Sequence, residues 1–65
     1  MSEEVRERVT TERDELEIKI KKLAAFIYNN DVFKKINPKQ QKLLKKQLVV
    51  MDAYLDILNE RLEVG

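Results

Sequence analysis

The sequence predicts an all-α fold, an antiparallel hairpin of two long helices that assembles into a homo-oligomeric four-helix or larger bundle. Residues that break helices are scarce, because the chain of 65 residues contains one glycine and one proline. Charged residues make up 38% of the chain, which suits long solvated helices. Two stretches carry apolar residues at heptad spacing on either side of a short connection. We expect a single domain, residues 1–65, because so short a chain holds at most one core.

The first helix is predicted at about residues 3–28. Ser2 is a suitable N-cap residue, and glutamates follow it at the positive end of the helix dipole. Arg6 and Arg13 interrupt the apolar seam, so this half either splays or packs its arginine stems over a partner. The seam residues are Val9, Leu16, Ile20, Leu23 and Ile27. Favourable i,i+4 ion pairs are predicted for Glu4–Arg8, Arg13–Glu17, Glu15–Lys19 and Glu17–Lys21.

The connection is predicted at about residues 29–37. It opens with Asn29-Asn30-Asp31, a composition that stops helices and forms turns. The apolar residues Val32, Phe33 and Ile36 follow, and we expect all three to point inward and close the core. Asn37-Pro38 then supplies an N-cap and a proline at the first helical position, which marks the start of the next helix.

The second helix is predicted at about residues 38–63, and its apolar surface is wider than one partner needs. Two parallel series form an arc of about 160°. The first series is Leu44, Leu48, Met51, Leu55, Leu58 and Leu62, and the second is Leu43, Val50, Ile57 and Val64, with Tyr54 between them. One helix cannot cover this arc, so we expect a second copy of the chain. The predicted oligomer interface is Leu43, Val50, Met51, Tyr54, Ile57, Leu58 and Arg61.

Charge is strongly segregated although the net charge is only +1. Residues 18–46 contain nine lysines and one acid, whereas residues 1–17 and 47–65 are both acidic overall. In a hairpin the lysines gather at the turn, where they oppose the dipole of the second helix. Two explanations stay open: the lysine end binds an anionic ligand, or it meets the acidic end of another copy. The predicted ligand-binding residues are Lys34, Lys35, Lys39, Lys42, Lys45, Lys46, Tyr28 and Phe33.

Catalysis and metal binding are disfavoured by composition. The chain has no histidine and no cysteine, which removes the usual general base and the usual zinc ligands. Asp52, Asp56 and Glu60 form i,i+4 carboxylate pairs, which we interpret as a solvated face. No arginine lies among the lysines, and this disfavours sequence-specific reading of nucleic acid. We therefore expect no enzyme activity and no cofactor. No apolar run approaches membrane-spanning length, so we expect no membrane partner.

The spacing of particular residues resembles that of small helical phage proteins of the crAssphage-related family. The matching residues are Glu7-Arg8-Val9, Glu15-Leu16, Ile20-x-x-Leu23-x-x-Phe26-Ile27, Phe33, Leu43-Leu44 and Gln47-Leu48-x-x-Met51-x-x-Tyr54-x-x-Ile57-Leu58-x-x-Arg61-Leu62. The resemblance implies a phage origin and action in the cytoplasm of a bacterial host. It supplies no catalytic residues.

Three functions follow as hypotheses. The first is a non-catalytic phage accessory protein that counters host defence by binding or sequestering an anionic, nucleotide-derived host signal or a host defence protein. The alternative is a structural or adaptor module that binds a phage or host protein through the second helix. The third is nonspecific binding of nucleic acid, which would rest on the lysines alone.

Overall fold

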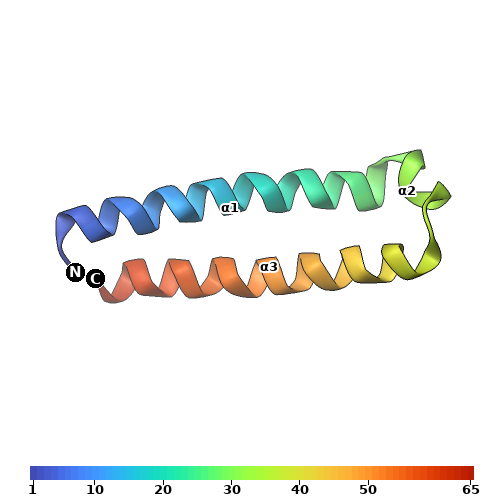
Figure 1. Cartoon of the computed structure of the whole chain (residues 1–65). Coiled ribbons are helices and arrows are strands. Elements are labelled where there is room, and N and C mark those ends of the chain that lie inside the picture. Colours follow the sequence, from blue (N-terminus) through green and yellow to red (C-terminus); the bar gives the residue numbers. More distant parts are fainter.

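The computed structural model describes all 65 residues and confirms the all-α hairpin arrangement. Helix α1 spans Glu3–Asn29, α2 spans Asp31–Lys35 and α3 spans Pro38–Val64. Figure 1 shows α1 and α3 running side by side in opposite directions, with the two chain ends together at one end and α2 at the other. The molecule is a rod of 46 × 15 × 13 Å. Both long helices end one residue beyond the predicted 28 and 63.

Side-chain caps set the start of each helix. The Ser2 hydroxyl accepts a hydrogen bond from the Val5 amide at 3.3 Å. The Asn37 side-chain oxygen accepts from the Lys39 amide at 2.7 Å, with Pro38 at the first helical position as predicted. These caps satisfy amides that have no partner inside the helix. The two long helices therefore begin at short polar sequences that cap them.

The connection contains a helical turn, α2, which the sequence had not predicted. The Asn30 side-chain oxygen accepts from the Val32 amide at 2.8 Å and starts this turn. Phe33 is buried and Ile36 is half-buried, but Val32 is exposed rather than inward. Because residues three apart share a face of a helix, the turn directs Phe33 and Ile36 inward together and leaves Val32 outside.

The core consists of two clusters along the α1–α3 contact. Near the chain ends, Val9 and Leu16 of α1 pack with Leu58 of α3, which is fully buried. Near the turn, Ile27, Phe33 and Leu48 form the second cluster. Ile20 packs against both clusters. Only six residues of the chain are buried, so the hairpin has a thin core.

The two arginines in the α1 seam join the helices by hydrogen bonds. Arg6 donates through Nη1 to the Leu62 carbonyl at 3.3 Å, and Arg13 donates through Nε to the Asn59 side-chain oxygen at 2.5 Å. The first half of α1 therefore stays against α3 instead of splaying. At the same end, the amino terminus of Met1 donates to the Gly65 carbonyl.

Candidate functional site

Three of the predicted ligand-binding lysines lie together in a surface groove. Lys39, Lys42 and Lys46 line it with Leu43, and its volume is about 420 Å³. These positions are spaced i, i+3, i+4 and i+7, which places them on one face of α3. We call this set of four residues the lysine groove. No carboxylate forms an ion pair with these three lysines, because Lys21 is the only lysine of the chain that takes part in an ion pair.

The position of the groove adds to its positive potential. It occupies the first turns of α3, which begin at the Asn37 cap, and the first turn contains no acidic residue. A helix N-terminus carries a partial positive charge. Lysines at this end therefore raise the local potential instead of neutralising it. An anion bound there would relieve repulsion both between the lysines and with the helix end.

Phe33 is part of the core and does not form part of a ligand surface. It is only 5% exposed, and its ring makes an edge-on contact with Phe26, with centroids 5.8 Å apart. The Lys45 ammonium lies 5.9 Å from the Phe33 centroid, so Lys45 covers this ring from outside. Base stacking on Phe33 would require opening the core. The structure thus removes Phe33 from the predicted binding residues.

The other predicted ligand-binding residues lie at the turn but outside the groove lining. Tyr28 is 69% exposed at the end of α1. Lys34 and Lys35 are exposed on α2. The Lys34 backbone carbonyl accepts a hydrogen bond from the Gln41 side chain at 3.4 Å. Leu43 was predicted only as an interface residue, and the spacing of Lys39, Lys42 and Lys46 would have placed it among them.

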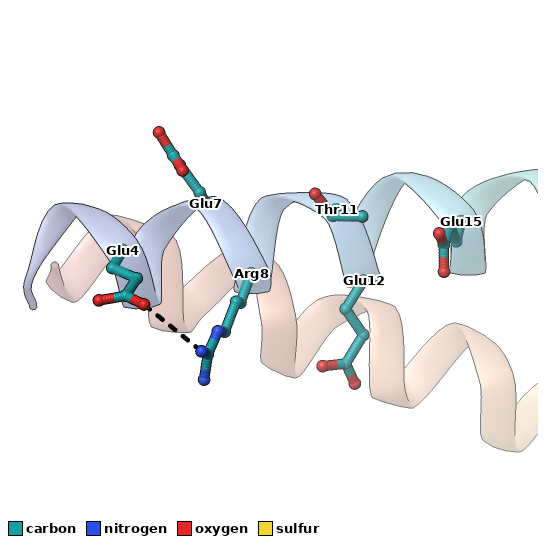
Figure 2. Close-up of a pocket in the computed structure, with 6 residues that line it drawn as sticks. All are labelled: Glu4, Glu7, Arg8, Thr11, Glu12 and Glu15. Atoms are coloured by element: carbon teal, nitrogen blue, oxygen red, sulfur yellow. Dashed lines mark hydrogen bonds and ion pairs between the residues drawn. The ribbon is translucent and has the colours of Figure 1, made fainter.

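A second groove, of about 440 Å³, lies on the outer surface of α1 and is acidic. It is lined by Glu4, Glu7, Arg8, Thr11, Glu12 and Glu15. In Figure 2 its carboxylates spread along the helix, with Glu7 and Glu12 pointing in opposite directions. The dashed contact is the ion pair of Arg8 with Glu4 at 3.5 Å. No group of three or more acidic side chains in the chain is arranged to hold a metal ion.

A third groove, of about 340 Å³, lies where the chain ends meet. Ile57, Glu60, Arg61 and Val64 of α3 line it, together with Met1 and Gly65. Arg61 is exposed and forms no ion pair within the chain. The sequence analysis assigned Arg61 to the oligomer interface, and this assignment stays a prediction.

Two residues of the predicted oligomer interface are used inside the hairpin. Met51 packs against the cluster that contains Leu58, and Leu58 is fully buried against α1. They belong to the series that faces α1, where Leu58 is fully buried and Met51 is half-buried. The remaining five predicted interface residues are exposed: Leu43, Val50, Tyr54, Ile57 and Arg61.

By its fold and its surface, the chain is a small all-α hairpin whose surface grooves are lined largely by charged residues. None of the helices is long and apolar enough to cross a membrane. The chain belongs to the Sequestin family, whose family model matches residues 3–64. The name of this family indicates a role in binding a partner. No curated protein and no solved structure matched the chain.

Proposed function

We propose that the chain is a non-catalytic phage accessory protein that sequesters an anionic, nucleotide-derived host signal in the cytoplasm of a bacterial host. The observation that carries this proposal is the lysine groove, with three ammonium groups that lack carboxylate partners. The family name supports sequestration, and the resemblance to crAssphage-related proteins supports a phage origin. Sequestration of such a signal would counter a host defence that depends on it.

The dimensions of the groove suit a nucleotide phosphate. Lys39 and Lys46 are seven residues apart, which is roughly 10 Å along a helix. Lysine ammonium groups bind phosphate as point charges and do not require the fixed geometry of a guanidinium. Leu43 supplies an apolar surface between them, and a base or ribose can lie on it. The groove is open, so a second surface would be needed to enclose the ligand.

We also propose that the chain works as a homo-oligomer. Five predicted interface residues are exposed on α3, and the monomer buries only six residues. Small domains without disulfides or metals commonly gain stability by association. More than one copy would also present several lysine grooves in one particle.

Thermal unfolding with added nucleotides tests sequestration. The panel contains cyclic nucleotides, linear nucleotides and inorganic pyrophosphate, at low salt. Ligand at a hundred times its Kd adds about 2.7 kcal/mol to the free energy of unfolding, which raises Tm. We expect a rise for the unchanged protein and its loss in the double variant Lys42→Gln/Lys46→Gln.

The matched control is Lys22→Gln, which removes one exposed lysine of α1 outside the groove. This variant should keep most of the Tm rise. Sequestration is contradicted if no member of the panel raises Tm, or if the double variant responds like the unchanged protein. Single-stranded polynucleotide serves as a further arm. Binding to it that weakens steeply with salt, without a response to nucleotides, would favour the nonspecific nucleic-acid hypothesis.

A second candidate function is an adaptor that binds a helix of a phage or host protein, including a host defence protein. The observation that favours it is the exposed apolar surface of α3, where Val50 is 66% and Ile57 is 52% exposed. Amphipathic helices dock on such surfaces through residues at i, i+3, i+4 and i+7. An adaptor would bind its partner equally well with the lysine groove removed, and this separates the two candidates.

A further inference from the structure

The side chain of Lys45 lies over an aromatic ring of the core. Its ammonium nitrogen is 5.9 Å from the centroid of the Phe33 ring. Phe33 is 5% exposed and belongs to the cluster with Ile27 and Leu48, so the packing around it holds the ring in place. Lys45 is exposed and forms no ion pair. Of the two partners in this contact, Lys45 is therefore the one that can move.

Lys45 is also a neighbour of the lysine groove, although it does not line it. It follows Lys42 by three residues and directly precedes Lys46 on α3. Residues three apart on a helix are neighbours, with Cβ atoms about 5–6 Å apart. The four-carbon stem of a lysine is flexible. The ammonium group of Lys45 can therefore reach either the Phe33 ring or an anion in the groove.

Repulsion between like charges accounts for the position of Lys45 in the free protein. The groove already holds three ammonium groups, and none of them has a carboxylate partner. Like charges three or four residues apart on a helix repel one another. The face of an aromatic ring carries partial negative charge, which attracts a cation. Phe33 thus offers the fourth ammonium group a favourable place outside the groove.

The contact between Lys45 and Phe33 can be broken without opening the core. A cation–π contact is significant out to about 6 Å, and 5.9 Å is close to that limit. Because Lys45 is exposed, its ammonium group exchanges the ring for water or for an anion and is never left without a partner. The Phe33 ring keeps its contacts with Phe26, Ile27 and Leu48 when the lysine leaves.

We propose that Lys45 is a fourth anion-binding residue of the lysine groove, which rests on Phe33 in the free protein and turns to the phosphate when a ligand binds. An anion in the groove reverses the electrostatic balance, because it attracts the ammonium group that the other three lysines repel. The proposal rests on the proposed function of the groove and adds a residue and a movement to it. The open groove would thus gain a further contact only when the ligand is present.

Calorimetric titration with inorganic pyrophosphate tests the role of the Lys45 charge. We expect Lys45→Met to raise the Kd about fivefold, which is the upper size for one ion pair at an exposed site. Methionine keeps an apolar side chain over the Phe33 ring, so Tm without ligand should change little. The matched control is Lys22→Met, which removes one exposed lysine of α1 outside the groove. Its Kd should stay close to that of the unchanged protein.

Proton NMR tests the movement, which a purely structural role of Lys45 would not produce. In the free protein the Hε protons of Lys45 should show a nuclear Overhauser effect to the ring protons of Phe33, because the ammonium group lies over this ring. Saturation with pyrophosphate should remove this effect. The effects between Phe33 and Leu48 should persist, because both side chains stay in the core.

Failure of this inference can be told apart from failure of the proposed function. If pyrophosphate binds but Lys45→Met and Lys22→Met have equal Kd values, the groove stands and the role of Lys45 is overturned. A Lys45–Phe33 effect that persists at saturation, or that is absent from the free protein, overturns the movement. If pyrophosphate does not bind the unchanged protein, the inference fails, and the nucleotide panel decides sequestration separately.

Discussion

At the scale of single residues, the densest polar network lies on α1 around Glu17. Arg13 Nη1 lies 2.8 Å from Glu17 Oε2 and 2.8 Å from Asp14 Oδ1, and Lys21 Nζ lies 3.4 Å from Glu17 Oε1. The hydrogen bond from Lys21 and the charge of Arg13 lower the pKa of Glu17. The hydrogen bond with Asp14 is the main cause that raises the pKa of Arg13. These contacts therefore favour the charged forms of Glu17 and Arg13.

The lowered pKa of Glu17 predicts a pH dependence of stability. A carboxyl whose pKa is lower in the folded state stabilises the fold above its unfolded pKa, and the gain is lost as pH falls through the folded pKa. We expect Glu17→Gln to lower Tm at pH 7. The Tm difference between this variant and the unchanged protein should narrow below about pH 4. Thermal melts from pH 7 to pH 3 measure this.

Glu12→Gln is the matched control, because Glu12 is exposed on the same helix and forms no ion pair. A Tm difference between Glu17→Gln and the unchanged protein that stays constant with pH would contradict the prediction. Three of the four ion pairs predicted for α1 are present: Glu4–Arg8, Arg13–Glu17 and Glu17–Lys21. The fourth, Glu15–Lys19, is absent.

At the scale of elements, the start of α3 is the best-specified feature of the fold. Asn37 caps the helix and Pro38 follows it, as the sequence predicted. The side chain of Gln41 donates to the Ile36 carbonyl at 2.9 Å, so the first turn of α3 also holds the end of the connection. Helix α2 was not predicted from the sequence, because its five residues are too few to show a helical period.

Removal of the Asn37 cap should destabilise the hairpin. We expect Asn37→Ala to lower the free energy of unfolding by about 1 kcal/mol, because the Lys39 amide loses its acceptor. Urea unfolding followed by circular dichroism measures the change. Asn37→Asp keeps an acceptor at the N-cap and should retain most of the stability. Equal losses in both variants would show that the cap does not account for the effect.

At the scale of the whole molecule, a thin core connects the two ends of a 46 Å rod. The cluster around Leu58 and the cluster around Phe33 share the neighbour Ile20, so the α1–α3 contact is continuous. Charge is divided along the same rod, with lysines toward the α2 end and the acidic groove of α1 toward the chain ends.

The continuous core predicts cooperative unfolding. Leu58→Ala should lower the free energy of unfolding by about 2–5 kcal/mol, since it leaves a cavity at a fully buried position. Amide exchange should quicken at Ile27 and Phe33 as well as around Leu58. Val49→Ala, at an exposed position of the same helix, should change stability little. Faster exchange confined to the chain ends would show that the two clusters unfold independently.

The sequence by itself determined the helices, the turn between them and the lysine-rich end. Heptad spacing, the Asn37-Pro38 cap and the charge pattern are local properties, so they could be read from short stretches. It did not show which of the two apolar series of the second helix faces α1, because both series recur at heptad spacing. Only the tertiary structure decided that Leu58 and Phe33 are buried, that Met51 packs against the Leu58 cluster, and that Lys39, Lys42 and Lys46 form one groove. The physical reason is that burial depends on which face α1 occupies, and that choice arises only when the two helices pack.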